Sequence, residues 1–139
     1  MATFSTTAPA RLATRLTFLT AGFAMACCAP LFPFIKDNVG ADETQFGLLL
    51  LCFGLGSIIA MPLTGFVATL HGPRSMVLLG GFGLVVFLPT LTISETPFIL
   101  GSFLFLFGAS LGTIYVAMNN QGVAVEAEEK RSLMSSFHA

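Results

Sequence analysis

The chain alternates between four long hydrophobic stretches and short polar segments. The stretches cover residues 14–35, 46–70, 76–93 and 97–118, and Arg15, near the start of the first, is their only charged side chain. A helix of roughly 20 residues crosses the ~30 Å hydrocarbon layer of a membrane. Each stretch therefore has the length of one transmembrane helix. The pattern predicts an all-α membrane protein with about four transmembrane helices.

The polar connectors are short and contain residues that favour turns and helix caps. Residues 36–45, 71–75 and 94–96 separate the stretches, segment 42–45 offers helix caps, and Pro97 suits a first helical position. Links this short force consecutive spans to run antiparallel. We expect a tail over 1–13, a four-helix bundle over 14–118, a loop over 119–134, and over 135–139 the start of a fifth helix that is cut off at Ala139.

Composition places most of the surface in lipid. The chain is 55% hydrophobic and only 9% charged, whereas soluble domains carry roughly 25% charged residues. The net charge of −1 and the lack of a long basic run exclude a nucleic-acid partner. Cys27, Cys28 and Cys52 lie in apolar stretches without metal-ligand spacing, so we interpret them as packing residues. We expect no metal and no cofactor.

The positive charges predict the orientation. Positively charged loops stay in the cytoplasm, and with antiparallel spans five of the six basic residues fall on one side: Arg11, Arg15, Arg74, Lys130 and Arg131. Lys36 alone falls on the other side. The amino terminus and the loop after the fourth span are therefore predicted to be cytoplasmic.

A cleaved signal peptide is the alternative interpretation of the first stretch. Arg11 and Arg15 precede it, and residues 24–27 resemble a cleavage site. The apolar run continues to Ile35, however, which is longer than the core of a signal peptide. A polytopic membrane protein is expected in either case.

Polar residues and glycines gather on separate helix faces. With about 100° per residue, the polar side chains of the fourth span fall within roughly 80° of one another; they are Ser102, Ser110, Thr113 and Asn120. Gly101, Gly108 and Gly112 cluster opposite, where they would let another helix approach closely. On the first span, Thr17 and Thr20 share one face. Such polar faces need a helix or an aqueous cavity beside them, although hydroxyls can also bond their own backbone carbonyls.

One catalytic pattern is excluded by its surroundings. Residues 108–112 match G-x-S-x-G, the nucleophile elbow of serine hydrolases, which needs a preceding strand and a histidine base. Here the pattern lies inside a predicted helix, and His71 and His138 both lie outside the spans. We therefore predict that the protein is not an enzyme.

The link between the second and third spans resembles a known loop signature. Gly65, Gly72 and Arg74 match the loop motif of the major facilitator superfamily, in which charged groups help to lock a cytoplasmic gate. Thr69 stands where the family usually has Asp, and Leu70 where it has a basic residue. The resemblance therefore leaves Arg74 as the charged group for a gating role.

Other positions narrow the resemblance. Leu104 occupies the place of the Arg that precedes a Gly in the drug-antiporter branch, which disfavours that branch. Segments 116–126 and 135–139 resemble a bacterial branch of the superfamily near the rhizopine transporter. From Arg11 onward, the resemblance implies an amino-terminal fragment of a permease, with about eight further helices missing. It also implies transport by alternating access, with helices one and four lining a central cavity.

These expectations combine into one functional hypothesis. We expect secondary transport of a small polar solute, such as a neutral polyol or an amino-sugar, across the bacterial inner membrane. Its partners would be the lipid bilayer, the solute and the remaining helices of the full-length transporter, and the fragment alone would be inactive. The expected cavity residues are Thr17, Thr20, Ser110 and Thr113, with Asn119 and Asn120 at the cytoplasmic mouth. The alternative is a small four-helix membrane anchor or assembly subunit.

Overall fold

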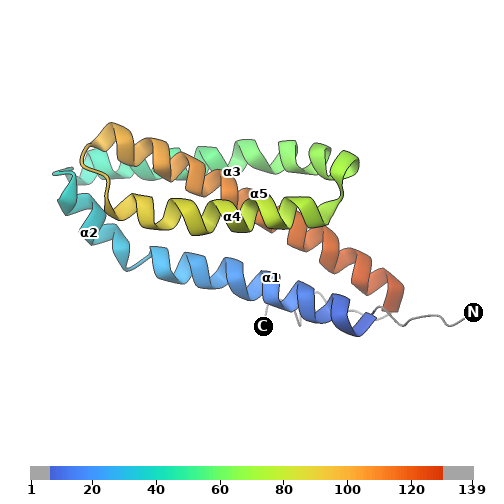
Figure 1. Ribbon diagram of the computed structural model, residues 1–139. Coiled ribbons are helices and arrows are strands. Elements are labelled where there is room, and N and C mark those ends of the chain that lie inside the picture. Colours follow the sequence, from blue (N-terminus) through green and yellow to red (C-terminus); the bar gives the residue numbers. More distant parts are fainter. Residues whose placement is uncertain (1–6, 130–139) are drawn as a thin grey trace, which may run out of the picture.

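The computed structural model describes residues 7–129, and this part of the chain is helical throughout except for short connections (Figure 1). No strand occurs within it. The helices, in chain order, are α1 (Thr7–Cys28), α2 (Leu31–Asn38), α3 (Glu43–His71), α4 (Pro73–Thr92) and α5 (Pro97–Glu129).

Three of these helices are long and apolar enough to cross a membrane: α3, α4 and α5. The pair α1 and α2 makes a fourth crossing if both helices belong to one span, which then bends by 48°. This architecture confirms the predicted all-α membrane fold. The chain is a multi-pass membrane protein.

The first span is broken at Pro30, between α1 and α2. Pro30 has no N–H group and cannot continue the hydrogen-bond ladder of α1. Around it, the Ala29 nitrogen donates to the Met25 oxygen at 3.2 Å, and the Phe32 nitrogen donates to the Ala29 oxygen at 3.3 Å. The chain then continues as α2, whose Ile35 side chain is completely buried.

The ends of α3 are fixed by side chain and backbone chemistry. Asp42 caps its first turn: the carboxylate accepts from the Gln45 nitrogen at 2.8 Å, and the Gln45 side chain accepts from the Asp42 nitrogen at 3.2 Å. At the other end Gly72 has φ of 79°, which ends α3 and which residues with a Cβ rarely adopt. Pro73 then opens α4 at a position where its missing N–H costs nothing.

Helix α5 is the centre of the bundle and packs against α3, α4 and α1 (Figure 1). Its backbone approaches that of α3 closely at two glycines. Gly108 lies against the Phe53 carbonyl, and a Cβ added at Gly112 would lie 2.6 Å from the backbone carbonyl oxygen of Ser57. On the α4 side, a Cβ added at Gly80 would lie 2.9 Å from the backbone carbonyl oxygen of Ser110. The predicted packing role of Gly108 and Gly112 is confirmed.

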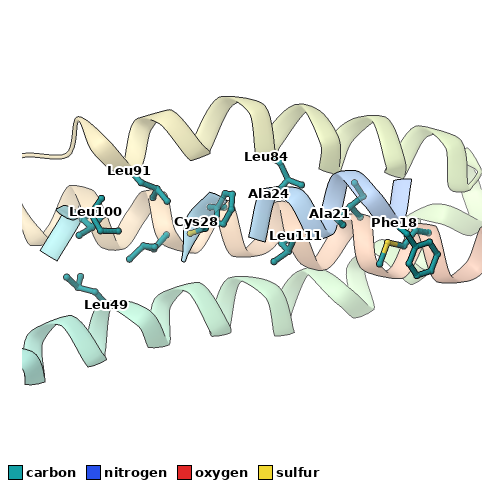
Figure 2. Packing of buried hydrophobic residues seen from close by; sticks show 14 of the residues in the cluster. Phe18, Ala21, Ala24, Cys28, Leu49, Leu84, Leu91, Leu100 and Leu111 are labelled. Atoms are coloured by element: carbon teal, nitrogen blue, oxygen red, sulfur yellow. The ribbon is translucent and has the colours of Figure 1, made fainter. Parts of the chain in front are cut away.

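Buried apolar side chains fill the space between the helices. Figure 2 shows Leu84 and Leu91 on the side of α4 that faces α5, with Leu100 and Leu111 coming from α5 itself. Large apolar side chains also point outward, for example Phe82 at 69% exposed and Phe98 at 85% exposed. Outward apolar surface of this extent fits contact with lipid tails.

Two predicted boundaries need correction. Helix α1 begins at Thr7, inside the predicted tail 1–13, because Pro9 is tolerated in a first helical turn. Helix α5 continues to Glu129, through most of the predicted loop 119–134, because the segment has no proline and buries Val125. Segments 1–6 and 130–139, including the predicted start of a fifth helix, lie outside the described residues.

Candidate functional site

The two hydroxyl groups of α1 that were predicted to line the cavity, those of Thr17 and Thr20, are turned onto their own helix. Thr17 is buried and Thr20 is exposed. The Thr17 hydroxyl donates to the Ala13 oxygen at 2.9 Å, and the Thr20 hydroxyl donates to the Leu16 oxygen at 2.8 Å. Each O–H donor is thereby used, while the lone pairs of each oxygen can still accept a hydrogen bond.

Ser110 and Thr113 of α5 are both buried, at 9% and 8% exposed, and they face different helices. The Ser110 hydroxyl donates to the Leu106 oxygen at 2.8 Å and lies directly against Gly83 of α4. Thr113 instead forms a hydrogen bond with Thr64 of α3, whose Oγ1 donates to the Thr113 Oγ1 at 3.1 Å.

The predicted cavity residues line two separate grooves. Thr17 and Thr20 lie with residues of α4 along an open groove of about 270 Å³ between α1 and α4. Ser110 and Thr113 line an open groove of about 330 Å³ between α4 and α5. Phe82 of α4 contributes to both grooves. The structure thus brings the residues together in pairs, and α4 lies between the pairs.

The two predicted asparagines lie further along α5. Asn119 is half-buried, and Asn120 is exposed. The lining of the two grooves includes neither of them. Their amide groups are therefore available on the helix surface in the last third of α5.

The motif residues around the α3–α4 link have distinct local roles. Gly72 supplies the positive φ that the turn requires, whereas a Cβ added at Gly65 would meet nothing within 4 Å. The Thr69 hydroxyl donates to the Phe66 oxygen at 2.7 Å, so this residue stabilises its own helix end. Arg74 is exposed in the first turn of α4.

Sequence reasoning missed two polar contacts between distant segments. One is Thr64, the partner of Thr113; its spacing of seven residues from Ser57, on the same face of α3, was the available signal. The other is Asn38, whose side-chain nitrogen donates to the Ser94 oxygen at 2.7 Å and ties the end of α2 to the end of α4. No periodic pattern points to Asn38.

The charged and metal-ligating side chains of the described residues lie apart from the grooves. Across residues 7–129 there is no group of three or more His, Cys, Asp or Glu side chains that could hold a metal ion. The ion pair between Lys36 and Glu43 joins α2 to the first turn of α3 and lies outside both grooves. The polar chemistry of the grooves is therefore that of hydroxyl groups.

Comparisons with known proteins agree on one family. The family model of the Major Facilitator Superfamily matches residues 16–139. An uncharacterized MFS-type transporter of Yersinia pestis is 47% identical over 128 residues, which cover 92% of this chain and 33% of that protein. An uncharacterized transporter of Sinorhizobium fredii is 33% identical over 122 residues, covering 88% of this chain and 32% of that protein.

A third relative is more distant. The membrane protein MosC of Rhizobium meliloti is 26% identical over 121 residues, covering 87% of this chain and 30% of that protein. No solved structure matches the chain significantly. The chain spans about one third of the length of the curated relatives it matches.

Proposed function

The chain belongs to the major facilitator superfamily, and from this premise we propose that it forms the amino-terminal part of a secondary transporter. The complete transporter moves a small polar solute across the bacterial inner membrane by alternating access. Substrates of such folds bind near the bilayer midplane, between repeated halves. Because the chain covers only one third of its relatives, it supplies one side of that site and is inactive alone.

The observation that carries this proposal is the burial of hydroxyl groups inside uncharged, membrane-length helices. Thr17, Ser110 and Thr113 are each at least nine-tenths buried, and polar side chains inside a membrane bundle face either another helix or an aqueous pathway. Hydroxyl groups offer both donors and acceptors without charge. This chemistry suits a neutral polyol or an amino-sugar.

We assign the primary solute contact to Ser110 and Thr113. Since α4 separates their groove from the groove of Thr17 and Thr20, one small solute contacts one pair at a time in this arrangement. Thr17 and Thr20 then line a second section of the pathway. Asn119 and Asn120 offer amide groups at its cytoplasmic mouth, as expected for a polar solute that leaves or enters there.

The orientation follows from the basic residues. Arg11 and Arg15 lie in the first half of α1 and Arg74 lies in the first turn of α4, and we assign these helix ends to the cytoplasm. The α3–α4 link with Gly65, Gly72 and Arg74 is then cytoplasmic, and Arg74 is its charged group for a gating contact with the other half of the transporter.

Uptake by the complete gene product tests the proposal. Radiolabelled myo-inositol and glucosamine serve as the polyol and amino-sugar probes in bacteria that express the complete gene or carry the empty vector. We expect saturable uptake of at least one probe above the vector level. A product that reaches the membrane and self-associates without taking up either probe would favour the anchor or assembly subunit instead.

A further inference from the structure

The hydroxyl groups of this bundle fall into two classes. Most of those in the described helices donate to a carbonyl three or four residues back on their own helix; Thr17, Ser102 and Ser110 are examples. Thr64 and Thr113 differ, because they bond each other across the α3–α5 interface at 3.1 Å. This pair is the only hydroxyl–hydroxyl bond between helices within residues 7–129.

One donor of this pair has no acceptor. Each threonine hydroxyl carries one O–H donor and two lone pairs. One bond joins two hydroxyls, so one of their two O–H donors is left over within the described residues; with Thr64 as the donor of the bond, it is the O–H of Thr113, the member of the pair that lines the groove. Thr64 is 4% exposed and Thr113 is 8% exposed, so bulk water does not satisfy this donor freely. Buried donors in native proteins are nearly always paired, which points to a ligand oxygen at this position.

The surroundings supply a matching acceptor. Thr113 and Ser110 line the same groove between α4 and α5 and stand three residues apart, which places them side by side on α5. The Ser110 O–H is already donated to the Leu106 oxygen, so its lone pairs remain. The groove thus offers one donor and one acceptor at adjacent positions, and a solute hydroxyl group, which both accepts and donates, is complementary to them.

We propose that Thr113 and Ser110 bind one hydroxyl group of a neutral polyhydroxyl solute, and that Thr64 is a positioning residue for this contact. By donating to Thr113, Thr64 holds the Thr113 hydroxyl in place at the α3–α5 interface, while the Thr113 O–H remains available to the solute. The inference rests on the proposed transport function and specifies its substrate class.

The test is myo-inositol uptake by the complete protein carrying Thr64→Val, Thr113→Val or Thr64→Ser. Valine keeps the shape of threonine and removes the hydroxyl, whereas serine restores the hydroxyl. We expect each valine variant to raise KM roughly tenfold, with little change in the maximal rate and in protein abundance. The reason is that the lost hydrogen bond weakens solute binding equally in the bound state and in the transition state of transport. Thr64→Ser should return KM to near the wild-type value.

Thr92→Val is the matched control, since the Thr92 hydroxyl donates to the Pro89 oxygen of its own helix and lies away from the groove. Unchanged KM in Thr64→Val would overturn the positioning role while leaving transport intact. An equal rise in KM in Thr92→Val would overturn it as well. Absence of myo-inositol uptake by the wild-type protein would overturn the polyol assignment itself, and this inference with it.

Discussion

Gly108 of α5 lies against the backbone carbonyl of Phe53 in α3, so that two membrane helices touch backbone to backbone. A Cβ at this position would overlap the carbonyl group, and no side-chain rotation could relieve the overlap. Gly112, one turn further on, repeats the contact at Ser57. In lipid, helices associate chiefly through such close packing and not through the hydrophobic effect. The α3–α5 interface is therefore a closely packed contact at the centre of this bundle.

The first prediction concerns this interface. Gly108→Ala should destabilise the complete protein by about 1–3 kcal/mol, because the added methyl group forces the two helices apart. The thermal midpoint in detergent, followed by fluorescence or light scattering, measures the effect. Gly54→Ala is the control: a Cβ there meets nothing within 4 Å, so alanine should be neutral or slightly stabilising. Equal midpoints for the two variants would contradict the close approach.

A second prediction separates the two motif glycines. Gly72 has φ of 79° and ψ of 156°, a backbone conformation that is nearly confined to glycine, and holding a residue with a Cβ there costs about 1–3 kcal/mol. Gly72→Ala should therefore lower the thermal midpoint. Gly65 lies within α3 and has open space around it, so Gly65→Ala should leave the midpoint unchanged. The assignment of conformational strain to the link would be wrong if both variants melted alike.

A third prediction concerns the end of the bundle opposite the α3–α4 link. Asn38→Ala should destabilise the protein by about 1 kcal/mol, since it removes the part-buried hydrogen bond to the Ser94 oxygen. Glu43→Gln removes the exposed Lys36–Glu43 ion pair and should cost less than about 1 kcal/mol. Melting in low and high salt distinguishes them, because only the ion pair is screened. A larger loss in Glu43→Gln would reverse the ranking.

The sequence predicted where the helices lie better than it predicted where they end and which helices pack together. Apolar run lengths located the membrane segments, because this feature acts within one helix, and the break of the first segment at Pro30 likewise has a local cause. Helix ends failed where packing decided them: burial of Val125 continues α5 into a segment whose composition resembles a loop.

The candidate site shows the same division. Helical periodicity grouped Thr17 with Thr20 and Ser110 with Thr113, and the structure keeps both pairs. Helical periodicity could not show that α4 separates the pairs, nor that Thr64 is the partner of Thr113. Both facts depend on how whole helices rotate against each other. Their joint role in one solute cavity stays a prediction.

The last prediction concerns how Ser110 must be mutated to test that role. Its hydroxyl group lies directly on Gly83 of α4, so there is no room for a larger side chain. Ser110→Leu should separate α4 from α5 and reduce the amount of folded protein, in the same way as Gly83→Ala, and lost uptake in either variant would report only misfolding. Ser110→Ala keeps the contact and removes the acceptor oxygen. We expect it to keep wild-type abundance and thermal midpoint while raising KM for myo-inositol several-fold. Wild-type KM in Ser110→Ala, with normal abundance, would show that Ser110 only packs the two helices together.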